Sequence, residues 1–250
     1  INVNFLTPGE SDAACGRAIL EYVGKAVDMA EAGEADAVVA CPQTQSSIKA
    51  AGIEFDGYPS WVARRTGTDP EDVFMMLVSD RLRIAHTTLH VGVREALGQI
   101  DTHRIVRVIK ATRTALHCIG IETPKIAVSG INPHAGEGGL FGTDDEKIVA
   151  PAIAEAQEIG VDAYGPFGAD TMYLDESYDA YVVMFHDQGH IPAKLLGFNG
   201  TAAFAIGTPV LFSSVAHGSA LDIAGRGKAD PGALIWAIKQ VSGAAVSAED

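Results

Sequence analysis

The sequence predicts an α/β fold in which helices flank a largely parallel sheet. Three observations indicate this class. Short apolar runs alternate with segments of helical periodicity, some of these runs are apolar throughout, and polar residues gather where they end. Strands buried on both faces give such continuous apolar runs. No internal repeat or low-complexity linker interrupts the pattern, so we expect one compact unit over residues 1–250, built as two intertwined α/β subdomains without a visible boundary.

The predicted helices carry apolar residues three or four positions apart, with capping or breaking residues at their ends. In the first helix, Ser11 or Asp12 is placed to cap the start and Gly33 to end it. The pattern predicts helices over residues 11–32, 46–51, 94–97, 102–119, 144–160 and 231–241, and a turn at 57–61 that leads into a helix ending at 66. Strands are predicted over residues 35–40, 73–78, 82–88, 125–130, 180–185, 202–206 and 209–212, and loops over 131–139, 186–194 and 217–225.

Composition and charge exclude several classes of partner. The 250 residues are 47% apolar and 20% charged, which is the balance of a globular protein with a sizeable core. A net charge of −14 disfavours nucleic acid and anionic membranes, because both bind basic surfaces. No apolar run approaches the roughly 18 residues of a membrane span. The three cysteines are scattered and form no disulfide or metal-binding pattern, which predicts a cytoplasmic location.

Three histidines, His90, His134 and His186, each follow a different predicted strand. If those strands are parallel neighbours, their ends meet at one edge of the sheet, where α/β proteins bind ligands. Asn132 and Asp187 lie beside two of these histidines, and such a cluster suits a divalent metal. The alternative is that each histidine packs or caps locally. His190 is near the cluster without having to join it, and core or surface roles are expected for His86, His103 and His117.

Other features carry weaker signals. Lys194 follows His186 closely, and it could move a proton at a metal site or lie on the solvated surface. The glycine-rich segment 136–139 permits a close approach of backbone to ligand. The segment 217–230 combines small residues with Asp222, whose carboxylate could accept hydrogen bonds from ribose hydroxyls. A GxGxxG motif does not follow any predicted strand, so an ordinary dinucleotide-binding site is not supported.

Three long motifs resemble the 4-hydroxythreonine-4-phosphate dehydrogenase family of pyridoxal phosphate biosynthesis. They are Asn-Pro-His-Ala-Gly-Glu-Gly-Gly at 132–139, Gly-Pro-Phe-Gly-Ala-Asp-Thr at 165–171 and His-Asp-Gln-Gly at 186–189. The resemblance covers nearly the whole sequence, although the N-terminal Gly-Asp-Pro-x-Gly-Ile-Gly-Pro-Glu motif of the family is missing from it. It implies a fold like those of isocitrate and isopropylmalate dehydrogenases. It also implies a homodimer with its active site at the interface.

The resemblance also implies roles for individual residues. The divalent metal would be bound by His90, His134 and His186, and a site at the interface allows one of them to come from the partner subunit. Zinc is the first candidate, followed by iron, cobalt, magnesium or manganese. The catalytic side chains would be Lys194, Asp187 and Asp170. The nucleotide would be NAD, since an acidic residue at the ribose repels a 2′-phosphate. It would be held by a loop similar to the adenosine-binding loop of isopropylmalate dehydrogenase, with contacts from His217, Gly218, Ser219, Ala220, Asp222 and Asp230.

The sequence departs from the family where the substrate phosphate is bound. Gln45 replaces a lysine, Phe212 an arginine and Ala203 an asparagine, while Gly-Tyr-Pro-Ser at 57–60 replaces Gly-His-Thr-Glu. Phosphate recognition uses Arg, Lys and other donors, so their loss predicts a substrate without phosphate. The expected substrate contacts are Tyr58, Ser60, Asn132, Phe212 and Gln45.

One branch of the family shares these changes, and it is similar to terephthalate 1,2-cis-dihydrodiol dehydrogenase. This resemblance implies an NAD- and metal-dependent oxidative decarboxylation of a carboxylated cis-dihydrodiol, giving protocatechuate. Activity on 4-phosphohydroxythreonine or a related phosphorylated sugar acid is the alternative within the family. Outside it, a metallohydrolase could use the same histidines with a bound water, and a non-catalytic protein could bind metal without turnover.

Overall fold

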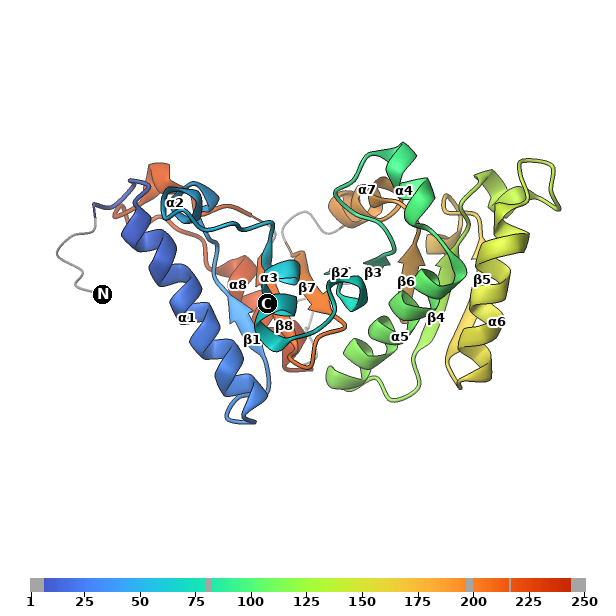
Figure 1. Ribbon diagram of the computed structural model, residues 1–250, viewed down its shortest axis with the longest axis horizontal. Helices are drawn as coiled ribbons and strands as arrows, with labels where there is room; N and C mark the ends of the chain where they lie inside the picture. The colour runs from blue at the N-terminus through green and yellow to red at the C-terminus, as the bar shows by residue number, and fades with distance from the viewer. Residues whose placement is uncertain (1–6, 80–81, 197–199, 216, 244–250) are drawn as a thin grey trace.

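The computed structural model describes residues 7–79, 82–196, 200–215 and 217–243, which form one mixed sheet with helices on both faces (Figure 1). The strands are β1 (Val38–Ala40), β2 (Phe74–Val78), β3 (Arg83–His86), β4 (Lys125–Ser129), β5 (Asp162–Phe167), β6 (Ala180–Val183), β7 (Ala202–Ile206) and β8 (Phe212–Val215). The α-helices are α1 (Ala13–Glu31), α2 (Gln45–Ala50), α3 (Tyr58–Thr66), α4 (Val93–Gln99), α5 (Thr102–Cys118), α6 (Ala150–Glu158), α7 (His186–Leu196) and α8 (Gly232–Val241). Single turns are η2 (Pro70–Asp72), η3 (Pro133–Gly136), η4 (Asp145–Val149), η5 (Met172–Leu174) and η6 (Leu221–Ile223).

The sheet has the strand order β1-β8-β7-β2-β3-β6-β4-β5. Neighbours from β3 to β5 are parallel, as are β1 and β8, whereas the pairings through β8, β7, β2 and β3 are antiparallel. Each step in a sheet adds roughly 20–25° of twist, so two distant strands that are formally antiparallel can end on the same side. In Figure 1, α2 follows β1 and lies in the upper part of the view, as do α4 and α7, which follow β3 and β6.

Alternating strand residues divide the core between the two faces of the sheet. On β6, Val182 packs in the cluster with α5 and α6, while Tyr181 and Val183 pack in the cluster that includes Ala193 of α7. This is the period of two expected of strands covered by helices. A third cluster lies between α1, α3, β1 and β8. We call residues 82–196 the central half and residues 7–66 with 200–243 the terminal half; treating them as subdomains stays a prediction.

The helices begin where the sequence provides caps. Asp12 accepts a hydrogen bond of 2.6 Å from the Ala14 amide at the start of α1, which confirms it as one of the two expected caps. Asp101 does the same for the Arg104 amide at the start of α5, at 2.7 Å. Such caps satisfy amide groups that have no partner within the helix. Within the described ranges, none of the helices combines the length and apolarity needed to span a bilayer.

Three elements of the structure differ from the prediction. Strand β5 was not predicted; it is an edge strand whose exposed Asp162 and Tyr164 leave it without a continuous apolar run. The strand expected at 209–212 begins only at Phe212, because it is set by pairing with β7 and β1. The loop expected after β6 is helix α7, which begins at His186.

Helix α7 forms despite an internal proline. Pro192 cannot donate to the carbonyl group of Gln188 four residues earlier, and such a loss normally breaks a helix. The Tyr173 hydroxyl donates to that carbonyl oxygen instead, at 2.7 Å. The side chain of Gln188 accepts from the amides of Met184 and Phe185 at 2.9 and 3.0 Å, which fixes the turn from β6 into the helix. These are tertiary and side-chain contacts that periodicity does not report.

Candidate functional site

The three predicted metal ligands follow three adjacent parallel strands. Strand β6 lies between β3 and β4 and pairs in parallel with both, which confirms that these strands are parallel neighbours. His90 follows β3, His186 follows β6 and His134 follows β4. Asp170 follows β5, the next parallel strand. All four residues therefore come from the same edge of the sheet, the usual ligand-binding edge of α/β proteins.

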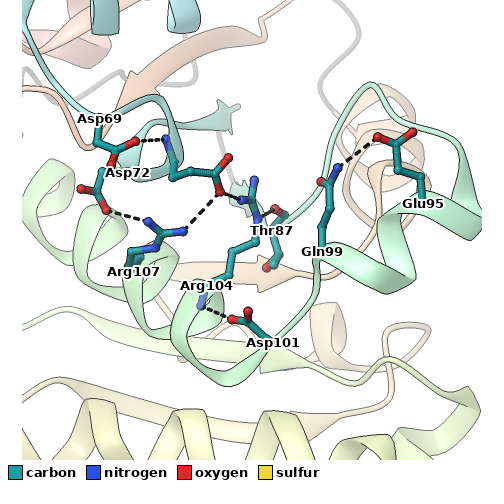
Figure 2. A network of polar contacts seen from close by, with 9 residues as sticks. Asp69, Asp72, Thr87, Glu95, Gln99, Asp101, Arg104 and Arg107 are labelled. Carbon is teal, nitrogen blue, oxygen red and sulfur yellow. Dashed lines mark hydrogen bonds and ion pairs between the residues drawn. The ribbon is translucent and has the colours of Figure 1, made fainter.

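The end of β3 is held firmly before His90. The amides of Thr87 and Thr88 donate to the carbonyl groups of Val183 and Met184 at 2.8 and 3.1 Å, which extends the contact between β3 and β6. Figure 2 shows Arg104 reaching from α5 to the same segment, and its Nε donates to the Thr87 carbonyl oxygen at 2.8 Å.

Arg104 also connects this segment to the preceding turn η2. Its guanidinium lies 2.6 Å from a carboxylate oxygen of Glu71, and Arg107 contacts Glu71 and Asp72 at 3.4 Å each. Figure 2 shows the two arginines side by side on α5. The network holds the backbone segment that leads to His90. We therefore assign it a structural role.

His186 is oriented by its neighbour in sequence. Its Nδ1 lies 2.7 Å from Oδ1 of Asp187, so an ionised carboxylate accepts the Nδ1 proton and leaves Nε2 free as an electron-pair donor. The rings of His90 and His186 have centroids 5.6 Å apart. Partial burial lowers the pKa of His90, and the nearby His186 adds to this by charge repulsion. The lowered pKa of His90 favours its neutral imidazole, which is the form that binds a metal.

Two histidines given minor roles by the sequence interpretation join this group. The ring of His190 stacks on that of His186 with centroids 3.7 Å apart and an interplanar angle of 11°. Nδ1 of His190 lies 3.1 Å from Nε2 of the buried His86. Burial lowers the pKa of His86 to about 3 and that of His190 to about 4. The spacing of four between His186 and His190 was an available signal, but it indicates one helical face only if the segment is recognised as a helix.

His134 lies on a strained loop. His134, Ala135 and Glu137 have φ angles of 51°, 52° and 43°, and the glycines 136, 138 and 139 complete a run of six left-handed residues. Non-glycine residues avoid this region unless the surrounding structure imposes it. The buried Asp145 holds the start of this loop by accepting from the amides of Ile131 and Asn132 at 2.7 and 3.2 Å.

Asn132, a predicted substrate contact, is occupied within this loop. Its side-chain amide donates to Asp144 and Asp145 at 3.0 Å each. The ring of His134 lies 5.8 Å from that of Phe141. Among the residues that the structure describes, no three His, Cys, Asp or Glu side chains lie close enough to hold a metal ion together. The three histidines thus do not form a closed ligand set within this one chain, and their role as ligands stays a prediction.

The predicted catalytic side chains are exposed and close to the histidines in the fold. Asp187 is next to His186, and Lys194 lies one helical turn beyond His190 on α7. The charge of Lys194 contributes to the lowered pKa of His190, behind burial and His186. Asp170 lies in a turn that passes close to His134, since a Cβ atom on Gly168 would lie 2.8 Å from Asp170 Oδ1 and 3.7 Å from the His134 Cα atom.

The predicted substrate residues of the terminal half are arranged differently. Tyr58 and Phe212 are 6% and 1% exposed, and their rings have centroids 5.0 Å apart. Burial raises the pKa of Tyr58 to about 12. Both rings fill the core between α3 and β8, and their role as substrate contacts stays a prediction. Ser60 is partly buried on α3, and Gln45 is exposed at the first position of α2.

The predicted nucleotide loop follows β8. Ser219 Oγ lies 2.6 Å from Thr44 Oγ1, which ties this loop to the one after β1. His217 Nδ1 donates to the Gly218 carbonyl oxygen at 3.0 Å, and Ala220 adopts a left-handed φ of 46°. Asp222 is exposed in η6, as nucleotide binding requires. Asp230 accepts from the Gly232 amide at 2.8 Å at the start of α8, so it has a structural contact as well.

Comparison with known proteins decides the family. Residues 1–241 match the family described as pyridoxal phosphate biosynthetic protein PdxA. The chain belongs to this family. It is 46% identical over 230 residues to a 1,2-dihydroxy-3,5-cyclohexadiene-1,4-dicarboxylate dehydrogenase of Comamonas sp, covering 92% of this chain and 73% of that protein.

Solved structures agree with this assignment. A terephthalate 1,2-cis-dihydrodiol dehydrogenase from Burkholderia xenovorans LB400 matches with a TM-score of 0.82 and 45% identity, covering 97% of this chain and 78% of the other. A 4-hydroxythreonine-4-phosphate dehydrogenase from Klebsiella pneumoniae matches with a TM-score of 0.86 and 37% identity, covering 95% and 73%. The predicted α/β fold of the dehydrogenase type, with a mostly parallel sheet flanked by helices, is confirmed. Since its relatives are dehydrogenases, the chain is an enzyme of this PdxA family.

Proposed function

We propose that this enzyme oxidises a cis-dihydrodiol of an aromatic carboxylate with NAD and a divalent metal, and that carbon dioxide is released. The favoured substrate is terephthalate dihydrodiol, which would give protocatechuate. The observation that carries this proposal is the apolar character of position 212. By the resemblance described above, Phe212 occupies the position of an arginine in the family members whose substrates are phosphorylated. Its ring packs against Tyr58 in the core. A buried phenyl ring offers no donor to a phosphate group.

The relatives support the same substrate class. The dehydrogenase of Comamonas, at 46% identity, is named for a cyclohexadiene diol dicarboxylate, whereas a relative named for 4-hydroxythreonine 4-phosphate is 39% identical. An acidic chain with a net charge of −14 repels a dicarboxylate in general. A local positive charge at the sheet edge is therefore needed, and Lys194 with a bound cation would supply it.

A divalent metal, when bound, would acidify the hydroxyl group that is oxidised and draw electrons from the carbonyl group that is formed. His186 fits this task, because Asp187 holds its Nδ1 proton and leaves Nε2 free. His90 fits through its lowered pKa and its position beside His186. Imidazole ligands place zinc first, with iron, cobalt, magnesium and manganese as the other candidates.

The remaining side chains would position reactants and move protons. Lys194 or Asp187 would take the hydroxyl proton as hydride leaves for the nicotinamide ring, and would return a proton after decarboxylation. Asp170 would orient Lys194 or Asp187, whichever of them transfers the proton. Asp222 would accept from the ribose hydroxyls of NAD, and its charge disfavours the 2′-phosphate of NADP. Rearomatisation of the ring makes the loss of carbon dioxide favourable.

The third histidine is proposed to come from a second copy of the chain. His90 and His186 lie together, whereas His134 packs against Phe141 in its own loop. A homodimer with its site at the interface would complete the set. The cytoplasm as the location of this dimer stays a prediction.

The decisive experiment measures NADH formation with a panel of cis-dihydrodiol carboxylates, before and after removal of metal by a chelator. We expect turnover with the terephthalate diol, its loss on chelation, and its return when a divalent metal is added. Activity that survives complete metal removal would contradict the metal's role. A preference for 4-phosphohydroxythreonine or a phosphorylated sugar acid would replace the proposed substrate with the second candidate, which the family's name supports.

The shared site is tested by mixing two inactive variants, His134→Ala and His186→Ala. If the ligands come from different copies, a hybrid dimer has one site with both lesions and one intact site. Random mixing makes half of the dimers hybrids, so about a quarter of the wild-type activity should return. If the mixture stays inactive although hybrid dimers form, all the ligands of one site come from a single chain.

A further inference from the structure

A buried histidine lies against the candidate site. His86, at the end of β3, is 2% exposed, and its ring centroid lies 4.8 Å from that of His190. Gly189 permits this close packing, because a Cβ atom at that position would overlap His86 Nε2. The motif glycine before His190 therefore leaves room for a second imidazole. Neither ring is needed for the proposed metal set, so their contact requires a separate account.

The hydrogen bonds of His86 fix the position of its proton. Its Nδ1 lies 3.3 Å from the carbonyl oxygen of Met75, which can only accept. His86 Nδ1 must therefore carry the proton in this contact. A buried imidazole that has no acidic partner is neutral and holds a single N–H. His86 Nε2 is consequently a bare acceptor.

The same reasoning extends to His190. Its Nδ1 lies 3.1 Å from His86 Nε2 and 3.2 Å from the carbonyl oxygen of His186. Both neighbours are acceptors, so His190 Nδ1 carries the proton and donates to them. His190 Nε2 then has a free electron pair. The ring is partly exposed and its Nδ1 edge is occupied, which leaves the Nε2 edge to meet a ligand.

The stacking of His190 on His186 excludes one use of this electron pair. An imidazole binds a metal along a direction that lies in its ring plane, and a shared ion must lie near both planes. The two rings are 3.7 Å apart with an interplanar angle of 11°, so their planes do not meet within coordination distance. His190 in this arrangement does not bind the same ion as His186. Its Nε2 is instead an acceptor beside that ion's candidate site.

We propose that His190 is a further substrate-binding residue, whose Nε2 accepts a hydrogen bond from a hydroxyl group of the bound diol. His86 is a positioning residue that holds His190 in the required tautomer. The inference rests on the proposed function for the identity of the hydroxyl group. The tautomer is a property of the chain alone. A vicinal diol suits this pair of neighbouring histidines, since one hydroxyl can approach the ion at His186 while the other donates to His190.

The first test observes the tautomers directly. In protein labelled with ¹⁵N-histidine, two-bond ¹H–¹⁵N spectra of the imidazoles should show both His86 and His190 protonated at Nδ1 and bare at Nε2. Signals are assigned with the variants His86→Gln and His190→Gln. A His190 protonated at Nε2 overturns the proposal, because that nitrogen would then be a donor.

The second test measures kinetics with the cis-dihydrodiol. His190→Leu should raise KM about three- to tenfold with a smaller change in kcat, which is the effect of losing one neutral hydrogen bond to substrate. His190→Gln should raise KM less than His190→Leu does, because its side-chain oxygen can accept near the former Nε2. His86→Leu should raise KM less and broaden the tautomer signals of His190, and His86→Gln should restore both.

An unchanged KM in a folded His190→Leu variant overturns the substrate contact. Equal KM values for His86→Leu and wild type, with unchanged spectra, overturn the positioning role. If the wild-type enzyme does not oxidise any dihydrodiol, the proposed function fails, while the imidazole spectra still decide the tautomer. The kinetic comparison is then made with the phosphorylated hydroxy acid that the enzyme does oxidise, and the same outcomes decide the contact.

Discussion

The central and terminal halves share one sheet but expose polar groups in different ways. In the central half, the strand order places the proposed metal ligands His90, His186 and His134 after adjacent parallel strands. In the terminal half, Tyr58 and Phe212 lie within the core, while Ser219 lies on a surface loop. We therefore expect the central half to provide the proposed reaction site. We expect the terminal half to influence substrate choice, because Phe212 there offers no donor to a phosphate group.

The largest effect should follow from changes at the central edge. His186→Ala should lower kcat/KM for the diol more than about 100-fold, since loss of even an outer partner of a metal ligand costs 10–100-fold. Steady-state NADH formation measures kcat/KM, and the metal content of the purified variant is determined alongside it. His103→Ala removes an exposed imidazole from α5 and should leave both values close to wild type. A His186→Ala enzyme with normal metal content and turnover would remove the functional distinction between the halves.

The terminal half should respond in stability first. Phe212→Ala removes a ring that is 1% exposed and should lower the free energy of unfolding by about 3–5 kcal/mol. Urea unfolding measures this loss. Phe212→Leu keeps most of the apolar volume and is the matched control, with a loss of less than about 1.5 kcal/mol. If Phe212→Ala is as stable as wild type but binds the diol poorly, the ring faces the substrate and not the core.

The buried histidine predicts a pH dependence for the central half. The folded-state pKa of His86 is lowered to about 3 by burial, below the ordinary value of 6.5. The unfolded chain therefore takes up a proton that the folded chain does not. This stability is fully present above about pH 6.5 and is lost as the pH falls toward 3, by up to about 1.4 kcal/mol per pH unit.

Urea unfolding between about pH 7.5 and 5 compares wild type with His86→Leu, in which the slope should be shallower. Ile109→Val provides a control, because it weakens a buried core cluster without removing an imidazole. It should lower the whole curve and keep the wild-type slope. Identical slopes for wild type and His86→Leu would show that His86 is not held neutral by burial.

The smallest effect concerns the nucleotide loop. Asp230 accepts from the Gly232 amide, so Asp230→Ala should lower the free energy of unfolding by about 1 kcal/mol. Asp230→Asn keeps a capping oxygen and should be close to wild type in stability. Measuring the KM for NAD in both variants separates the two roles. A KM that rises in Asp230→Asn as well indicates that the charge contacts the nucleotide.

A good part of the fold could be predicted from periodicity alone. Helix α1 and its cap Asp12 follow from apolar spacing and a local hydrogen bond, both of which are written in neighbouring residues. The same holds for α5. Strand β5 could not be predicted, because its burial pattern at the edge of the sheet is irregular. Helix α7 could not be predicted either, because it depends on Tyr173 to donate to the Gln188 carbonyl oxygen that Pro192 leaves without a partner. Contacts between distant residues leave no local pattern.

The sequence by itself determined which residues could carry the chemistry: three histidines after strands, a motif that places Asp187 beside His186, and an apolar residue at position 212. Only the tertiary structure decided how they meet. It stacked His190 on His186, set His86 behind His190, and packed Phe212 against Tyr58. The reason is physical. Residue types and spacing define hydrogen-bonding and charge, but the register and twist of the sheet define which side chains come within a few ångströms of one another.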